Sequence, residues 1–338
     1  MNDFDYVKAR DVNDAVSQIT KHSAARFIAG GTNLIDLMKE NVERPTRLID
    51  ITGLPLKEIE ETQAGGLRIG ALVPNSDLAY DERITTHYPL LSSAILAGAS
   101  AQLRNMASTG GNLLQRTRCL YFYDITTPCN KREPGSGCGA LDGFNRLNAI
   151  LGWSKSCIAV HPSDMCVALA ALEVAVQVVG PRGGRAIPFA NFHRLPGDTP
   201  EIDTNLAHDE IITAIELPAE GFSRNYSYLK IRDRLSYAFA LVSVAAALRI
   251  EAGGIKDARV ALGGVAHKPW RVPEAEQTLE GRQPSRTAFG EAADVILQDA
   301  MGFAHNSFKI ELARRAIVRA LEQAAAGTPQ SQSSKKIF

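Results

Sequence analysis

Apolar residues recur at regular intervals along the first 60 residues and predict alternating strands and helices. Residues 25–29 and 47–51 are short apolar runs typical of buried strands, whereas residues 11–21 and 34–39 have helical spacing. Breaks rich in glycine and proline separate these runs. The pattern predicts a compact α/β unit at the start of the chain.

Similar patterns continue along the rest of the chain. Up to residue 220 they predict strands at 67–72, 174–179, 184–188 and 210–217, and helices at 89–101 and 164–173. Beyond a boundary near 219–224 they predict strands at 226–232, 236–251 and 258–263, and helices at 285–297 and 308–326. We therefore expect an α+β protein with a domain over residues 1–220 and a smaller domain over 221–326. The tail, residues 327–338, is polar and expected to be disordered.

The segment between residues 104 and 161 has no clear periodicity. It contains four of the five cysteines and the sequence Pro134-Gly135-Ser136-Gly137. Irregular stretches longer than about 12–15 residues within compact domains are usually functional or disordered. The spaced cysteines favour a functional loop, and residues 115–160 are called the cysteine loop below.

Composition excludes several classes of protein. Lys plus Arg and Asp plus Glu both number 37 in the 338 residues, so no basic field is present to attract nucleic acid. No run approaches the roughly 18 apolar residues of a membrane span. The N-terminus has no secretory signal pattern. We expect a cytoplasmic protein, or a periplasmic one if a signal-bearing partner subunit carries it across the membrane.

Two glycine turns offer a place for a phosphate-containing ligand. Gly30-Gly31-Thr32-Asn33 lies between an expected strand and helix, where backbone N–H groups approach an anion without a Cβ in the way. Ser108-Thr109-Gly110-Gly111-Asn112 offers hydroxyls, an amide and further backbone N–H groups. Two such turns suit a long ligand with a central diphosphate. Neither turn has the dinucleotide pattern G-x-G-x-x-G.

These turns, together with His161-Pro162-Ser163-Asp164 and Tyr228-Leu229-Lys230, occur in the order found in the flavoproteins of the xanthine dehydrogenase family, which the chain resembles over about residues 4–326. The resemblance implies an FAD-binding domain of the vanillyl-alcohol-oxidase (PCMH) type, made of two α/β subdomains. A smaller C-terminal α+β domain of the CO-dehydrogenase-flavoprotein type would follow it.

The resemblance also implies which residues bind FAD. They are Phe27, Ile28, Ala29, Gly30, Gly31, Thr32, Asn33, Leu34, Ser108, Gly110, Gly111, Asn112, His161, Asp164, Ile212 and Lys230. The first turn would hold the diphosphate and the second the ribityl and phosphate groups. Without the resemblance, the preferred readings are a helix cap for Asp164, a core residue for Ile212 and a solvated strand end for Lys230. Tyr237 and Phe239 would lie near the isoalloxazine, or in the core of a strand.

Cys119, Cys129, Cys138 and Cys157 have the spacing C-x9-C-x8-C-x18-C. Four thiolates in one loop suit a cubane iron–sulfur cluster or a tetrahedral zinc ion, and spacing alone does not choose between them. Disulfides are a third reading, less favoured for a chain without an export signal. Cys166 lies in an apolar helix and is interpreted as a buried free thiol.

The cysteine loop resembles one branch of the family, the FAD subunits of periplasmic aldehyde oxidoreductases, whose loop binds a 4Fe–4S cluster. The resemblance implies that the same four cysteines ligate this cluster here. Nearby cations would offset the cluster's charge, or would be solvated surface charges. They are Arg116, Arg118, Lys131, Arg132 and Arg146.

The implied function is electron transfer within a heterotrimer. A large molybdenum-cofactor subunit would oxidise the substrate, a small 2Fe–2S subunit would relay electrons, and FAD in this chain would pass them to an external acceptor. No catalytic acid, base or nucleophile is therefore expected in this chain. The alternatives are a stand-alone flavin oxidoreductase of the same fold and a zinc-stapled interaction module.

Overall fold

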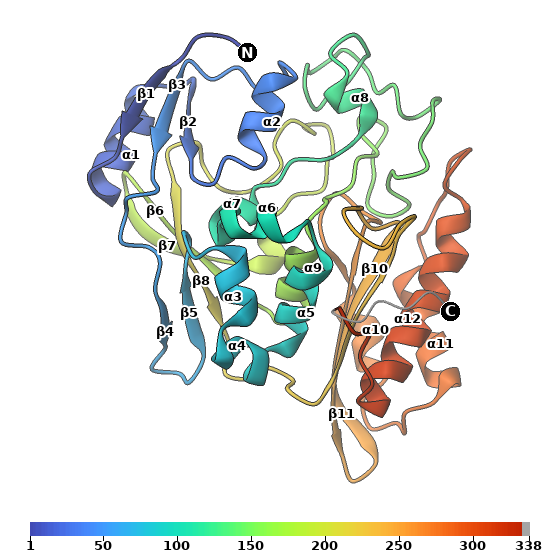
Figure 1. Cartoon of the computed structure of the whole chain (residues 1–338). Coiled ribbons are helices and arrows are strands. Elements are labelled where there is room, and N and C mark those ends of the chain that lie inside the picture. Colours follow the sequence, from blue (N-terminus) through green and yellow to red (C-terminus); the bar gives the residue numbers. More distant parts are fainter. Residues whose placement is uncertain (333–338) are drawn as a thin grey trace.

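The computed structural model describes residues 1–332, and Figure 1 shows three sheets with helices packed around them. The first sheet is parallel and has the order β1 (Asp5–Lys8), β3 (Arg47–Asp50), β2 (Ala25–Ile28). Its helices are α1 (Val12–Lys21) and α2 (Leu34–Lys39). Helix α1 begins at Val12 because the Asp11 carboxylate accepts the N–H of Asp14 at 2.8 Å. It buries Ala15, Val16 and Ile19, as its spacing predicts.

The second sheet has five antiparallel strands. In spatial order they are β4 (Ile59–Glu61), β5 (Leu67–Gly70), β8 (Ile211–Leu217), β6 (Ala175–Gly180) and β7 (Gly183–Pro188). Ile215 is paired in register with Ile69 on one side and Val176 on the other, and all three are fully buried. Such cross-strand apolar pairs fix the register of the sheet.

Helices cover one face of this sheet and form the largest core with it. They are α3 (Asn75–Tyr80), α4 (Glu82–His87), α5 (Pro89–Ala97), α7 (Thr109–Leu113) and α9 (Asp164–Ala171), with the short 3-10 helix η1 (Phe189–Asn191) beside them. Helix α6 (Ala101–Met106) packs against α3 and buries none of its residues. Helix α5 ends at Ala97, four residues earlier than its pattern predicts, because Gly98 takes an extended conformation.

The third sheet belongs to the C-terminal part of the chain. Its order is β12 (Trp270–Arg271), β11 (Gly254–Gly263), β10 (Val242–Glu251), β9 (Asn225–Ile231), and its helices are α10 (Pro273–Gln277), α11 (Arg286–Ile296) and α12 (Phe308–Ala326). Strand β10 alternates between two cores. Ala245 and Ala247 face α5 and α9, whereas Val244 and Leu248 face α11 and α12. The sheet therefore joins the two parts of the molecule (Figure 1).

Two features at the edges of this sheet refine the expectations from sequence. The strand expected from residue 236 begins at Val242, and Tyr237 and Phe239 lie in a loop with 60% and 44% of their surfaces exposed. The alternation of these two aromatic residues resembles that of a strand, but neither side chain is buried. In the described part of the tail, Gln330 accepts the Lys230 N–H at 3.2 Å and Gln332 donates to the Tyr228 carbonyl at 3.3 Å. Residues 333–338 lie outside the described residues.

The cysteine loop is irregular, as expected, apart from the short helix α8 (Leu120–Tyr123) and isolated β-bridges. Hydrogen bonds from the C-terminal domain fix residues 148–150, near the end of the cysteine loop. The Asn306 amide donates to the carbonyls of Asn148 and Ala149 at 3.2 and 3.1 Å, and the Met301 N–H donates to Ile150 at 2.8 Å. The buried Lys309 ammonium donates to the Asn148 carbonyl at 2.8 Å. A loop without regular structure is thereby fixed in place.

Candidate functional site

A cavity of about 1240 Å³ runs between the first sheet, the second glycine turn and the loop before β10. It exceeds the roughly 300–1,000 Å³ usual for pockets that hold drug-sized ligands, so it suits a longer one. Of the expected FAD-binding residues, all but His161 line it: Phe27, Ile28, Ala29, Gly30, Gly31, Thr32, Asn33, Leu34, Ser108, Gly110, Gly111, Asn112, Asp164, Ile212 and Lys230. His161 lines a separate small cavity behind the Pro162–Asp164 segment.

The first glycine turn presents unused hydrogen-bond donors to the cavity. Within the described chain, the backbone N–H groups of residues 30–33 have no acceptor. Gly31 has a φ of +72°, which a glycine adopts without strain. A Cβ on Gly30 would lie 1.7 Å from the Met106 carbonyl oxygen, so this glycine lets the two turns pack together. The amide nitrogen of Asn33 is buried without a partner and also lines the cavity. These donors fit a diphosphate.

The second glycine turn differs from the prediction. Its backbone N–H groups are used within the chain: Thr109 donates to Val73 at 2.9 Å, Gly110 to Ala71 at 2.8 Å and Asn112 to Ser108 at 2.9 Å. Gly111 donates to the Ser108 hydroxyl at 3.3 Å, since Ser108 caps helix α7. The expectation that this turn offers free N–H groups is therefore wrong for Thr109, Gly110, Gly111 and Asn112. What it presents to the cavity is the surface of its small residues and the Asn112 side chain.

Asp164 and Lys230 form a buried ion pair at the wall of the cavity. The Lys230 ammonium donates to one carboxylate oxygen of Asp164 at 2.7 Å, and the Tyr228 hydroxyl donates to the other at 2.7 Å. Burial and the Asp164 charge raise the pKa of Tyr228 well above its usual value, so this hydroxyl stays a donor. Asp164 is not the helix cap that its local sequence suggests, because Ser163 caps α9. Lys230 is not a solvated strand end, because it is only 5% exposed.

Ile212 is a core residue, as one of its two sequence readings has it, and it also lines the cavity. At the other end, Tyr237 and Phe239 line the cavity from their loop. The Arg118 guanidinium lies 5.3 Å from the centre of the Phe239 ring. Asn75 was not predicted as a site residue. Its side-chain oxygen is buried without a partner and lines the cavity, adding an acceptor to the donors of the first turn.

The cysteine loop gathers its four thiols around one region. Cys129 and Cys138 face each other in a β-bridge, and Cys119 interacts electrostatically with Cys129 and Cys157. All five cysteines of the chain are free thiols. Within the described residues, no three of the four sulfurs are close enough to bind one metal ion. Zinc would require sulfurs about 3.8 Å apart, from Zn–S bonds of about 2.3 Å. A cubane cluster, whose thiolates bind different iron atoms, holds them farther apart.

The thiols of this loop already receive hydrogen bonds. The Asn148 amide donates to the Cys119 sulfur at 3.5 Å, and the Ala159 N–H donates to the Cys157 sulfur at 3.4 Å. Burial raises the pKa of Cys157 to about 12, with the Lys131 charge opposing the shift. Such N–H groups stabilise a thiolate once a metal displaces the proton.

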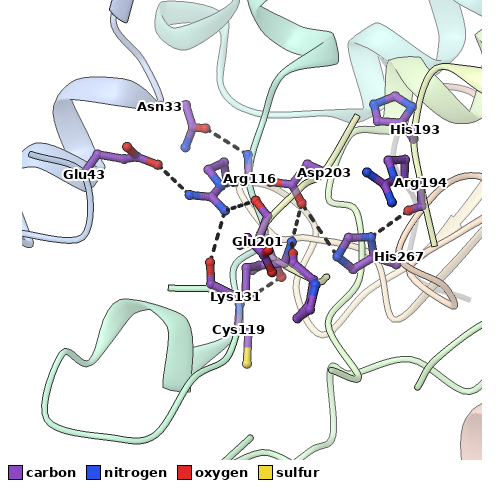
Figure 2. Close-up of polar contacts among 12 residues, drawn as sticks. Asn33, Glu43, Arg116, Cys119, Lys131, His193, Arg194, Glu201, Asp203 and His267 are labelled. Atoms are coloured by element: carbon purple, nitrogen blue, oxygen red, sulfur yellow. Dashed lines mark hydrogen bonds and ion pairs between the residues drawn. The ribbon is translucent and has the colours of Figure 1, made fainter. Parts of the chain in front are cut away.

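A network of ion pairs links two cations of the cysteine loop to Asp203 and Glu43 (Figure 2). The Lys131 side chain is only 1% exposed, and its ammonium group forms an ion pair with Asp203. The Arg116 guanidinium contacts Asp203 at 2.9 Å and Glu43 at 2.5 Å. Burial opposes ionisation of Asp203, but Lys131 and Arg116 together lower its pKa below the ordinary value. The reading of Lys131 as a solvated charge is therefore wrong.

The other cations of the loop are placed differently. Arg132 donates to the carbonyls of Tyr121 and Phe122 at 2.7 and 3.0 Å, and Arg146 forms an exposed ion pair with Asp233 at 2.8 Å. Asp203 and Glu43 already balance Lys131 and Arg116, so these two cations do not stand free to offset a cluster. Sequence reasoning missed Asp203 and Glu43 because they lie more than 70 positions from Lys131 and Arg116, and no local pattern marks ion-pair partners that far apart.

Comparisons with known proteins agree with this fold and site. Residues 2–220 match the family described as the FAD binding domain in molybdopterin dehydrogenase, and residues 226–324 match the CO dehydrogenase flavoprotein C-terminal domain. The chain belongs to the FAD-binding flavoprotein subunits of the molybdenum hydroxylases, which confirms the resemblance and the fold class predicted from sequence. It therefore binds FAD.

Particular relatives make the placement more specific. The chain is 51% identical to the aldehyde oxidoreductase FAD-binding subunit PaoB of Escherichia coli, over 96% of this chain and 99% of that protein. It is 27% identical to the glyceraldehyde dehydrogenase medium chain of Sulfolobus acidocaldarius, over 83% of this chain and 82% of that one. The carbon monoxide dehydrogenase of Hydrogenophaga pseudoflava shares the fold, with a TM-score of 0.76 at 24% identity over 96% of this chain and 98% of that chain. Among the described helices, none is long and apolar enough to cross a membrane.

Proposed function

We propose that this chain is the electron-transferring FAD subunit of a molybdenum-dependent aldehyde oxidoreductase. It acts with a large subunit that carries the molybdenum cofactor and a small 2Fe–2S subunit, and electrons leave its flavin for an external acceptor. FAD supplies the one- and two-electron chemistry when bound. The chain binds and orients this cofactor and excludes water from it, so no residue of the chain is assigned as acid, base or nucleophile.

One observation carries the FAD assignment: a single cavity joins the free N–H groups of residues 30–33 to the Tyr237 and Phe239 loop. The diphosphate binds at the first turn, where the donors are unpaired. Ser108, Gly110, Gly111 and Asn112 contact the ribityl and phosphate groups mainly through their surfaces, since the N–H groups of Gly110, Gly111 and Asn112 are occupied. Asp164, Ile212 and Lys230 form the wall, and the isoalloxazine lies toward Tyr237 and Phe239.

The same proposal places a 4Fe–4S cluster on Cys119, Cys129, Cys138 and Cys157. Two observations support it. The four sulfurs surround one region but are too far apart for a single zinc ion, and two of them receive N–H bonds from the chain. The resemblance to the aldehyde oxidoreductase branch supports the cluster and also the aldehyde substrate, whose pocket lies on the large subunit.

Co-expression with its partner subunits tests the proposal. The purified complex should reduce an artificial acceptor when given an aromatic aldehyde, whereas this chain alone should not. This chain should retain about one flavin and about four irons. Cys138→Ala should lose the iron and keep the flavin, and the exposed substitution His87→Ala should lose neither. Aldehyde turnover by the isolated chain would indicate a stand-alone flavoenzyme, and zinc in place of iron would indicate a zinc-stapled module.

A further inference from the structure

A second group of side chains suited to a metal ion includes none of the four loop cysteines. His161, Cys166 and His193 place their ligand atoms within 4.8 Å of one another. His161 precedes α9, Cys166 lies in the first turn of α9, and His193 follows η1. Among the described residues, this is the one His, Cys, Asp and Glu group with spacing tight enough for a single ion.

The ring nitrogens of this group are in the state that binds a metal. His193 Nε2 lies 2.8 Å from the Leu113 carbonyl oxygen, which only accepts, so Nε2 carries the proton and Nδ1 presents a lone pair. That Nδ1 is buried without a partner, as is His161 Nε2. Buried unpaired nitrogens are unfavourable unless something binds them.

We propose that His161, Cys166 and His193 bind a single structural metal ion of the zinc type, distinct from the proposed cluster and next to the FAD cavity, which His193 also lines. Two imidazoles and one thiol form a borderline-soft donor set that suits zinc. Zinc–ligand bonds of about 2.0–2.3 Å require the three ligand atoms to lie about 3.3–3.8 Å from one another. Side-chain movements of about 1 Å would bring them to these separations. The thiol proton of Cys166 leaves to solvent as the metal binds.

The surroundings of the site match those of buried metal centres. A backbone carbonyl accepts the second ring N–H of His193, an arrangement that orients most metal-binding histidines. Phe189 and Phe192 pack edge-on against the His193 ring, with centroids 5.5 and 4.9 Å away, and shield it from water. The ion would tie α9 to the η1 segment and, through Leu113, to the end of α7. These three segments support the wall of the FAD cavity.

Metal analysis of the full-length chain tests the proposal. After chelation, wild-type protein should rebind about one equivalent of zinc and unfold at a higher temperature with it. Cobalt(II), used as a probe, should give a thiolate-to-metal charge-transfer band. Cys166→Ala, a small change inside α9, should weaken zinc binding by at least about 100-fold, more than losing a surrounding hydrogen bond does, and should abolish the band. His87→Ala is the matched control.

The result separates this site from the proposed cluster. Cys166→Ala should lose zinc but keep iron and flavin, whereas Cys138→Ala should lose iron and keep the cobalt band. Equal zinc binding and equal thermal shifts in wild type and Cys166→Ala would overturn the proposal, as would cobalt binding without a thiolate band. Either result leaves the electron-transfer function standing, because that function rests on iron and flavin content.

Discussion

The backbone N–H of Arg116 donates to the side-chain oxygen of Asn33 at 3.0 Å, which joins the start of the cysteine loop to the first glycine turn. The Arg116 side chain extends the link through Glu43 and Asp203 (Figure 2). The other side-chain atom of Asn33, its amide nitrogen, faces the FAD cavity. The proposed cluster loop and the proposed diphosphate site therefore share one rigid connection.

Gly31→Ala should weaken FAD binding. Its φ of +72° strains any side chain, so the backbone of the turn that presents the free N–H groups is disturbed. The new Cβ would also lie 2.6 Å from the Cδ1 atom of Ile35, whose side chain must move away. Gly253→Ala is the matched control, because Gly253 has a φ of +81° with nothing within 4 Å of the added Cβ. Both should lose roughly 1 kcal/mol of stability to backbone strain. Only Gly31→Ala should lower the flavin-to-protein ratio, and an equal loss in both would contradict the role of this turn.

Asp203→Asn should destabilise the fold because it leaves the buried Lys131 without its anion. Breaking a fully buried pair costs about 3–5 kcal/mol, and the 28% exposure of Asp203 reduces the expected loss to roughly 2–3 kcal/mol. Glu291→Gln removes an exposed partner of Arg282 and should cost less than about 1 kcal/mol. Denaturant unfolding measures both. Similar losses for the two variants would show that the Lys131 pair adds little.

The stability of the fold should decrease as the pH falls from about 6.5 to about 4. Burial lowers the pKa of His267 to about 4, whereas in the unfolded chain it is about 6.5. Between these values the unfolded chain binds a proton that the folded chain does not. The free energy of unfolding therefore falls, by roughly 3 kcal/mol from this residue over the whole window.

His267→Asn isolates this contribution. His267 Nδ1 lies 2.8 Å from the Arg194 carbonyl oxygen, and an asparagine amide can donate at the same place without titrating. Denaturant unfolding between pH 7 and pH 4.5 should give a shallower decline for this variant than for wild type. Parallel curves would show that His267 is not the residue that titrates.

Asn148→Leu should lower the reduction potential of the proposed 4Fe–4S cluster. The Asn148 amide donates to the Cys119 sulfur at 3.5 Å, and such a bond favours the more negative, reduced cluster. One hydrogen bond of about 0.5–1.5 kcal/mol corresponds to roughly 20–60 mV for a one-electron couple. A redox titration followed by electron paramagnetic resonance measures the shift. Asn205→Leu, whose amide bonds to the Asn191 carbonyl instead, should leave the potential unchanged.

Local patterns in the sequence predicted helices α1, α2, α5, α9, α11 and α12 and most strands correctly, but missed the short helices α4, α6, α7, α8 and α10. The 3.6-residue period of α1 and α12 and the apolar runs of β2 and β3 depend on neighbours a few positions away. The same reasoning placed the first glycine turn between β2 and α2, where it lines the cavity. Family resemblance, rather than pattern, added Asp164 and Lys230 to the cavity wall.

What the sequence did not reveal depends on contacts between distant segments. Lys131 and Asp203 are 72 positions apart, and no spacing marks them as a pair. The second turn looked open because its N–H acceptors, Ala71 and Val73, lie more than 30 positions earlier. Tyr237 matched a strand by alternation alone, and only the fold shows that it lies in a loop with most of its surface exposed.

The two-faced strand β10 means that neither family module is complete without the other. Its alanine face closes the hydrophobic interior of the FAD-binding part, while its opposite face closes that of the C-terminal part. Cutting the chain between residues 220 and 226 would expose apolar surface on both fragments. Exchanging the C-terminal module between relatives would therefore succeed only where the donor carries equally small side chains on that face.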